Sequence, residues 1–169
     1  MTNPSDADAD FERVVRTYGD SLSRVAWGYT EHRADHDDLL QDVLVALWRA
    51  LPNFRGESSE RTFVFRVAHN RGLSFVGRRR RHGPLPESDD YADPRPGPDV
   101  ELDRAQRRDR LVAAVRRLPE AQRQAVMLHL EGFSAREIAA MQGTTENNVA
   151  VRLTRARQAL RVRLGAEDT

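Results

Sequence analysis

Cysteine and lysine are both absent from this chain of 169 residues, and aromatic residues make up only 7 % of it. Without cysteine there is no disulfide bond, no thiolate metal site and no cysteine nucleophile, which is typical of a reducing cytoplasm. No apolar run approaches the roughly 18 residues of a membrane-spanning helix. The first residues are polar and acidic, unlike a signal peptide. We therefore expect a cytoplasmic protein without membrane insertion.

The formal net charge of +1 conceals a strong segregation of charge along the chain. Residues 55–86 contain 8 arginines and 2 acidic residues, and residues 104–169 contain 13 arginines and 7 acidic residues. Between these blocks, residues 87–103 contain 7 acidic residues and 1 arginine. Two basic blocks indicate two surfaces for a polyanion, although solvated helix faces would give the same pattern.

Proline divides the chain into two parts. Five of the 8 prolines lie between residues 84 and 98, in a stretch with too few apolar residues to bury a core. We predict a flexible linker over 84–103, between a domain over 9–83 and a domain over 104–165. Strand-length alternation is absent. The expected fold class is all-α, with two small helical domains joined by a flexible proline-rich linker.

Three helices are predicted in the first domain, over residues 11–29, 37–51 and about 60–79, because apolar residues recur there at helical spacing. Asp10 is the expected N-cap of the first helix. Gly72 is expected to weaken the third by about 1 kcal/mol relative to alanine.

The second domain carries the clearest local signal. Ser134 and Glu137 are spaced as a capping box, Gly143 provides a tight turn, and a long helix with one apolar stripe follows from Glu146 to about Leu164. This order predicts a helix-turn-helix whose second helix enters the major groove of DNA. A helix pair with a solvated arginine face is the alternative.

A different nucleic-acid signal occurs in the first domain, where arginines alternate with aromatic residues. Arginine follows a phosphate backbone while aromatic rings stack on unpaired bases, so this mixture suits a single strand. Phe54, beside Arg55 and Gly56 in a loop, is expected to face nucleic acid. Phe63 is expected to belong to the core instead.

Together these motifs resemble those of a family, the extracytoplasmic-function sigma factors of bacteria. Residues 35–43, DHDDLLQDV, resemble the family segment D-x-E-D-L-x-Q-E-V. Phe54-Arg55-Gly56 and the following residues to Asn70 resemble F-R-G…T-W-L…A-x-N. The C-terminal motifs of the family, L-P…G-x-S-x-x-E-I-A and V-x-x-R-x-x-R-A-R-x-x-L, are matched as well. The first corresponds to Leu118-Pro119 and the capping box, and the second to VAVRLTRARQAL at residues 149–160. The motifs occur in order over about residues 9–165.

The resemblance implies a sigma factor that binds the two largest subunits of core RNA polymerase, directs promoter recognition and DNA melting, and is controlled by an anti-sigma factor. The residues that it places against polymerase are Asp37, Asp38, Leu40, Gln41 and Asp42. The residues that it places at the single-stranded −10 element are Phe54, Arg55, Gly56, His69 and Asn70. The residues that it places at the −35 duplex are Asn147, Asn148, Val151, Arg152, Thr154 and Arg155. It implies no catalytic residue, cofactor or metal.

Some positions depart from the family pattern. Phe63 replaces a tryptophan, and Ser74 and Gly77 stand where the family has an aspartate and the start of an arginine run. We therefore expect the contact of this helix with upstream duplex to be the weakest part of the resemblance. Asn147-Asn148 replace the usual G-T, so the −35 preference is not inherited.

Two other functions fit parts of the sequence. A helix-turn-helix regulator could bind duplex DNA without polymerase, using the apolar helix over 35–48 as a dimer face. A metal-dependent enzyme could use His32 and His36, spaced four apart with carboxylates nearby, although no third ligand motif or general base is evident.

Overall fold

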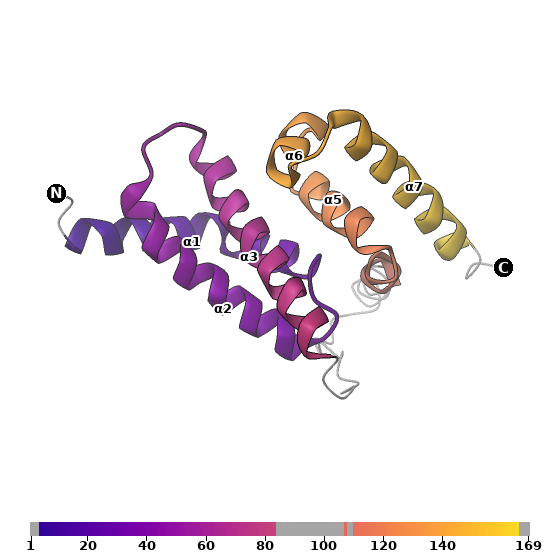
Figure 1. Cartoon of the computed structure of the whole chain (residues 1–169), viewed down its shortest axis with the longest axis horizontal. Coiled ribbons are helices and arrows are strands. Elements are labelled where there is room, and N and C mark those ends of the chain that lie inside the picture. Colours follow the sequence, from indigo (N-terminus) through magenta and orange to yellow (C-terminus); the bar gives the residue numbers. More distant parts are fainter. Residues whose placement is uncertain (1–3, 84–106, 108–109, 166–169) are drawn as a thin grey trace, which may run out of the picture. The chain divides into compact units, whose positions relative to one another are not determined.

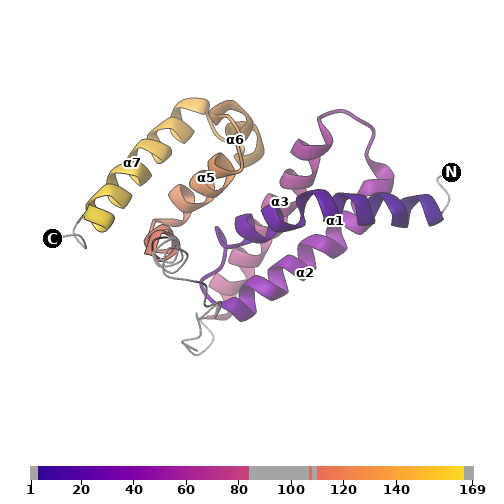
Figure 2. The same cartoon turned by 180° about the vertical axis from the view of Figure 1, so that it is seen from behind.

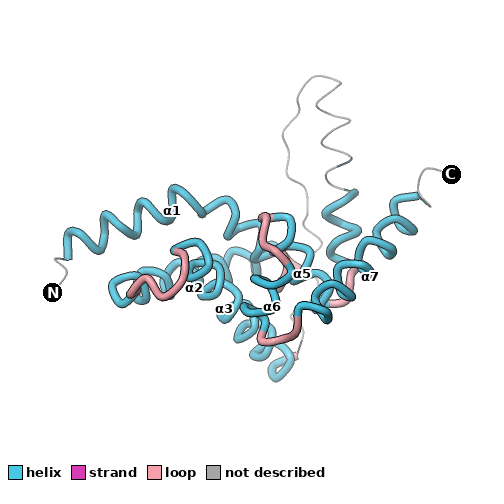
Figure 3. The backbone as a smooth tube through the Cα atoms, turned by 90° about the horizontal axis from the view of Figure 1, so that it is seen from above, coloured by secondary structure: helices cyan, strands magenta, loops and turns pink. Residues whose placement is uncertain are grey.

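The computed structural model describes residues 4–83, 107 and 110–165, which consist of helices and connecting loops (Figures 1 and 3). These residues contain no strand. The chain divides into two compact units, Met1–Ser88 and Asp89–Thr169, here called the N-terminal and C-terminal domains. The all-α two-domain prediction is confirmed. The linker predicted over 84–103 lies outside the described residues.

The N-terminal domain consists of α1 (Pro4–Ala26), α2 (Arg33–Ala50), the short 3-10 helix η1 (Leu51–Asn53) and α3 (Glu60–His82). Helices α2 and α3 run antiparallel, and α1 crosses both, as the view from behind shows (Figure 2). Each helix contributes one apolar face to the core. The fully buried side chains of this core are Val14, Leu22, Val25, Leu39, Leu47, Val64 and Phe65.

Helix α1 begins earlier than predicted. Asp10 is not an N-cap, because the helix starts at Pro4. Proline is well suited to the first turn, where its missing N–H is not needed, and carboxylates early in a helix are favoured by the helix dipole. Asp10 therefore lies inside α1, where it pairs with Arg13.

Arg13 also connects α1 to the beginning of α3. Its guanidinium donates two hydrogen bonds to the carboxylate of Glu60, at 2.9 and 2.5 Å. These hydrogen bonds lower the pKa of Glu60. Ser59 caps the same helix end, since its hydroxyl accepts from the backbone N–H of Thr62 at 3.0 Å.

Gly72 does not loosen α3, contrary to the prediction. It is buried, and the ring of Tyr29 lies so close that a Cβ at this position would be 2.5 Å from two ring atoms. The hydroxyl of the same tyrosine is hydrogen-bonded to His69 Nδ1 at 2.5 Å. Gly72 therefore allows the segment after α1 to pack directly against the middle of α3.

The C-terminal domain contains α5 (Glu120–Leu130), α6 (Ala135–Gln142) and α7 (Glu146–Gly165), and residues 110–116 before them are helical. Helix α7 packs against both α5 and α6 (Figure 1). The core consists of residues from all of these elements, with Leu128, Phe133, Ile138, Val149 and Ala156 almost completely buried.

The helix-turn-helix prediction is confirmed in its local detail. Ser134 Oγ accepts from the backbone N–H of Glu137 at 3.2 Å, and the Glu137 carboxylate accepts from the backbone N–H of Ser134 at 2.8 Å. Gly143 ends α6 with φ of 61°, in the left-handed region that glycine adopts without strain. The hydroxyl of Thr145 accepts from the backbone N–H of Asn148 and so begins α7.

Candidate nucleic-acid and partner interfaces

A pocket of about 400 Å³ opens between the loop after η1 and the first turns of α3. Aromatic, amide, hydroxyl and charged side chains all contribute to it. Its lining residues are Asn53, Phe54, Arg55, Glu57, Ser58, Phe63, Arg66, Val67 and Asn70. Three of the five residues expected at the −10 element, Phe54, Arg55 and Asn70, therefore lie together around one cavity.

Phe63 belongs to this pocket and not to the core, contrary to the prediction. Its ring is half-buried, and its centroid lies 4.6 Å from that of Phe54 at an interplanar angle of 32°. The core position is taken by Phe65, which is 1 % exposed. Periodicity alone could not separate these two rings, because both lie in the same helical segment.

His69 is the expected −10 residue that the structure places elsewhere. Its side chain is buried, and Tyr29 occupies its Nδ1 atom. Burial lowers the pKa of His69 to about 4, so the ring is neutral near pH 7. In this structure the His69 side chain faces the interior of the domain, while its neighbour Asn70 is exposed.

Two pocket residues of the loop, Glu57 and Ser58, were not expected from the sequence as members of a site. Arg66 was expected only as one of the arginines that alternate with aromatic residues, and it lies one turn after Phe63 and one turn before Asn70. The spacing of Phe63, Arg66 and Asn70 places all three on one face of α3. That spacing is the signal that separates Arg66 from the other arginines.

The exposed face of α2 forms a second surface. Asp38, Gln41, Val45 and Trp48 follow one another at spacings of three and four, and all four are exposed. Val45 and Trp48 are 41 % and 51 % exposed, which is high for large apolar side chains on one stripe. An apolar stripe next to a carboxylate and an amide is typical of a protein interface.

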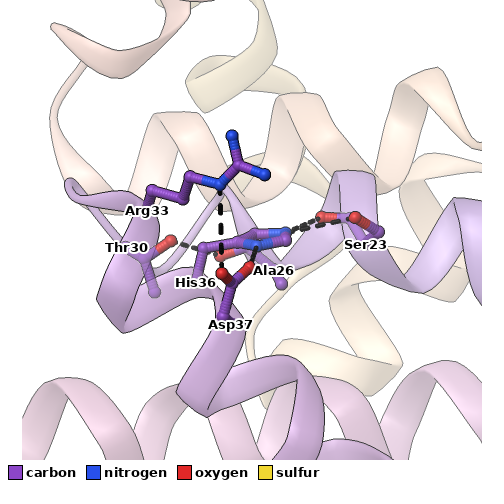
Figure 4. A network of polar contacts seen from close by, with 6 residues as sticks. All are labelled: Ser23, Ala26, Thr30, Arg33, His36 and Asp37. Carbon is purple, nitrogen blue, oxygen red and sulfur yellow. Dashed lines mark hydrogen bonds and ion pairs between the residues drawn. The ribbon is translucent and has the colours of Figure 1, made fainter. Parts of the chain in front are cut away.

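The start of α2 is held by a buried histidine (Figure 4). His36 Nε2 donates to the backbone oxygen of Ser23 at 2.9 Å, and the ring stacks on Trp27 with centroids 4.1 Å apart. His36 Nδ1 lies 3.1 Å from the carboxylate of Asp37, which Arg33 also approaches to 3.9 Å. Of the residues expected to face polymerase, Asp37 is thus exposed but already partnered. Leu40 and Asp42 are only half-exposed.

Two carboxylates of α2 pair with the arginine run at the end of α3. Asp35, which is buried, forms an ion pair with Arg79. Asp42 Oδ2 lies 3.4 Å from Arg78 Nη2. These contacts place Asp42 between the two helices, so its carboxylate is engaged within the domain.

The exposed face of α7 forms the third surface. Val149, Leu153 and Ala156 face the core, whereas Asn147, Val151, Thr154 and Arg155 are exposed. The two remaining −35 residues are exposed only in part or are engaged. Arg152 donates to the side-chain oxygen of Gln142 on α6 at 2.9 Å, and the amide of Asn148 donates to the hydroxyl of Thr144 at 3.2 Å.

The described residues contain no group of three histidine, cysteine or acidic side chains placed to hold a metal ion. Both ring nitrogens of His36 contact protein atoms. The pair of His32 and His36 therefore has no third ligand among the described residues. In the same part of the chain, no helix has the length and apolar character needed to cross a membrane.

The two domains with these surfaces are those of a sigma-70 type protein. The Sigma-70 region 2 family matches residues 14–82, and the Sigma-70, region 4 family matches residues 108–160. The chain is 31 % identical over 160 residues to the ECF RNA polymerase sigma factor SigM of Mycobacterium tuberculosis, which covers 94 % of this chain and 79 % of SigM.

Solved structures agree with this assignment. CnrH in complex with the cytosolic domain of CnrY has a TM-score of 0.64 and 26 % identity, covering 94 % of this chain and 90 % of CnrH. The sigma factor RpoE of Bartonella quintana, in complex with the anti-sigma factor NepR, has a TM-score of 0.75, and the match covers 92 % of this chain and 97 % of RpoE. At 24 % identity this likeness supports the fold alone.

The chain belongs to the ECF family of RNA polymerase sigma factors. As such it directs promoter recognition by RNA polymerase, and the alternative of a duplex-binding regulator that acts without polymerase is not favoured. Members of this family are initiation factors and not enzymes.

Proposed function

We propose that the two domains divide promoter recognition by the state of the DNA. The N-terminal domain takes an unstacked base of the −10 element into the pocket around Phe54, Phe63 and Asn70. The C-terminal domain places the exposed face of α7 in the major groove of the −35 duplex. The observation that carries this proposal is the pocket itself, whose lining combines the Phe54–Phe63 ring pair with the amide of Asn70.

The chemistry of the pocket fits an extruded base. The tilted pair Phe54 and Phe63 offers ring surface for stacking, worth about 1–3 kcal/mol per base. The amide of Asn70 both donates and accepts, as the edge of a base requires. Arg55 and Arg66 lie at the same cavity and supply positive charge for the flanking phosphates. A base within a duplex could not enter, so use of this site requires melting.

The chemistry of α7 fits a duplex. A helix fits the major groove, and its exposed amide and guanidinium groups pair with base edges or phosphates. Asn147 and Arg155 are exposed on the face opposite the core stripe. Arg152 has a hydrogen bond to Gln142, so we assign it a role in holding α6 and α7 together as well as in contacting DNA.

Polymerase contact is assigned to the exposed stripe of α2. Asp38 and Gln41 provide polar groups, and Val45 and Trp48 extend the expected set with apolar area. The free protein should bind promoter DNA weakly, because two small surfaces on separate domains need a common partner to fix their spacing. Specific nanomolar binding by the free protein at physiological salt would contradict this.

The division of labour is tested by two variants in holoenzyme, on duplex and pre-melted templates. Arg155→Ala should weaken initial duplex binding by about 1–3 kcal/mol and matter less on a pre-melted template. Asn70→Ala should leave initial binding nearly intact but slow opening, measured by permanganate reactivity. The proposal fails if Asn70→Ala loses duplex affinity with normal opening, or if Arg155→Ala affects only opening.

Control by an anti-sigma protein is proposed by analogy with the complexes of RpoE with NepR and of CnrH with CnrY. The chain then acts as a binding factor in the cytoplasm, where polymerase is found, and contributes no catalytic group of its own. Co-purification of the chain with a single partner that blocks its binding to core polymerase would support this part of the proposal.

A further inference from the structure

The ion pair between Asp35 and Arg79 joins two helix ends. Asp35 lies in the first turn of α2 and Arg79 in the last turn of α3, which meet because the helices are antiparallel. Each charge lies at the helix end whose dipole favours it. A buried ion pair gives little net stability compared with an apolar pair, but removing one partner leaves a costly unpaired charge. The pair therefore fixes where the last turn of α3 docks on α2 more than it stabilises the domain.

That constraint matters because Arg79 belongs to a run of four arginines, residues 78–81. Successive residues of a helix point about 100° apart, so four in a row cover the whole circumference. Holding one of them against α2 keeps this last turn helical and in place, and so keeps the others in the directions that the helix gives them. Arg79 points inward to Asp35, and Arg78 reaches the second carboxylate of α2, Asp42, at 3.4 Å.

Arg81 is consequently directed away from α2. It lies about 200° around the helix from Arg79, is exposed, and makes no hydrogen bond or ion pair with the residues that the structure describes. Eleven residues earlier stands Asn70, which is three helical turns and about 20° away. Asn70 and Arg81 thus share one exposed face of α3, about 16 Å apart along its axis.

We propose that Asp35 is a positioning residue for promoter opening. By pairing with Arg79 it holds the last turn of α3 against α2, so that Arg81 stays on the face of Asn70 and contacts a backbone phosphate of the strand whose base occupies the Asn70 pocket. On the side of that base where the DNA is still duplex, with a rise of about 3.4 Å per nucleotide, the phosphate lies about five steps away. This inference rests on the proposed function of the pocket, and it divides the arginine run between holding α2 and holding DNA.

The test uses holoenzyme and promoters in which one phosphate at a time is replaced by an uncharged methylphosphonate. In the wild type, replacement about five steps from the extruded base should slow opening about tenfold, the value of one charged hydrogen bond. Arg81→Ala should be insensitive to that replacement. Asp35→Asn should be equally insensitive although Arg81 is intact, and Asp20→Asn, an exposed carboxylate of α1, should behave as wild type.

A purely structural role for Asp35 gives different results. Unchanged sensitivity in Asp35→Asn overturns the proposal, and so does a slowing that is uniform over all phosphates. If Asp35→Asn does not fold, Arg79→Lys and Arg79→Gln decide: the lysine variant should keep the sensitivity and the glutamine variant should lose it. The opposite order, or no difference between the two, also overturns the proposal.

Failure of the pocket assignment would look different from failure of this inference. If Asn70→Ala opens promoters normally and no phosphate depends on Arg81, the proposed function of the N-terminal domain is wrong. If Asn70→Ala slows opening while the phosphate pattern is independent of Asp35, only the positioning role is wrong.

Discussion

The two domains present their candidate DNA surfaces in opposite shapes. The N-terminal domain offers a cavity bounded by a loop and a helix, whereas the C-terminal domain offers the outer face of a single helix, α7. A cavity accepts a base only after it has left the stack, and a protruding helix reads a groove that is still intact. Under the proposed division of labour, shape and not charge would separate the surface for melted DNA from the surface for duplex, because both carry arginine.

The domains also differ in how their sites are supported. The N-terminal domain relies on polar contacts between distant segments, Tyr29 with His69 beside the pocket and Asp35 with Arg79 at the far end of α3. The C-terminal domain relies on local devices, the capping box and the left-handed Gly143. The first domain should therefore respond to changes of buried charge, and the second to changes at helix ends.

The largest expected effect concerns the exposed stripe of α2 in the N-terminal domain, to which we assign polymerase contact. Asp38→Arg reverses an exposed charge, and like-charge contacts at an interface cost several kcal/mol, so binding to core polymerase should fall by about 100-fold or more. The melting temperature should not change, because an exposed substitution costs little stability. The matched control is Asp20→Arg on α1. Wild-type binding and initiation by a normally folded Asp38→Arg would refute the assignment.

Acid should destabilise the N-terminal domain more than the C-terminal domain. The pKa of His69 is about 4 in the folded state, below the ordinary value of 6.5, so the unfolded chain binds the proton more readily. The contribution of neutral His69 to the free energy of unfolding is then fully present above about pH 6.5. It falls by about 1.4 kcal/mol per pH unit as the pH is lowered to 4. Urea unfolding followed by tryptophan fluorescence measures this, since Trp27 and Trp48 both lie in the N-terminal domain.

The matched variant for this pH prediction is His69→Gln, which removes the titrating ring. Its unfolding free energy should depend less steeply on pH over the same range. An equal slope in the variant and the wild type would show that other groups cause the acid sensitivity.

A glycine pair sharpens the comparison within the N-terminal domain. Gly72→Ala places a Cβ against the ring of Tyr29 and should cost about 1–3 kcal/mol by overpacking. Gly77→Ala meets nothing within 4 Å and should instead stabilise the helix by about 0.5–1 kcal/mol. Thermal melting followed by tryptophan fluorescence should show shifts of the melting temperature in opposite directions. A higher melting temperature for Gly72→Ala would show that the Tyr29 ring moves aside without cost, against the prediction.

The smallest expected effect lies in the C-terminal domain. Glu137→Ala removes one half of the capping box and should lower the stability of that domain by about 1 kcal/mol. Circular dichroism should register the loss while tryptophan fluorescence, which reports on the other domain, stays unchanged. Coincident shifts of both signals would show that the domains unfold together.

Local rules predicted the features that depend on neighbours in sequence. The capping box at Ser134, the turn at Gly143 and the apolar stripe of α7 were all readable, because each depends on residues within a few positions. The family motifs predicted the sigma-factor assignment, because each motif is a short run of residues that can be recognised without the fold. The apolar periodicity likewise predicted three helices in the first domain, with ends close to those observed except for the start of α1, which lies at Pro4 instead of Phe11.

Features that depend on residues far apart in sequence were not readable. Phe63 and Phe65 differ in burial because of which helix lies opposite, and Gly72 owes its role to Tyr29, more than 40 residues earlier. His69 was placed at the −10 element by the family resemblance, yet in the helix it points about 100° away from Asn70 and is buried. Burial of this kind is a property of packing between helices.

The link between Arg13 and Glu60 has a consequence for synthesis of the chain. It joins α1 to α3 across 47 residues. On a ribosome, α1 and α2 emerge before the helix that completes their packing, and the N-terminal domain closes only once α3 has been released. Because domains fold as units from the N-terminus onward, we expect the exposed stripe of α2 to be in place while the helix-turn-helix is still being translated.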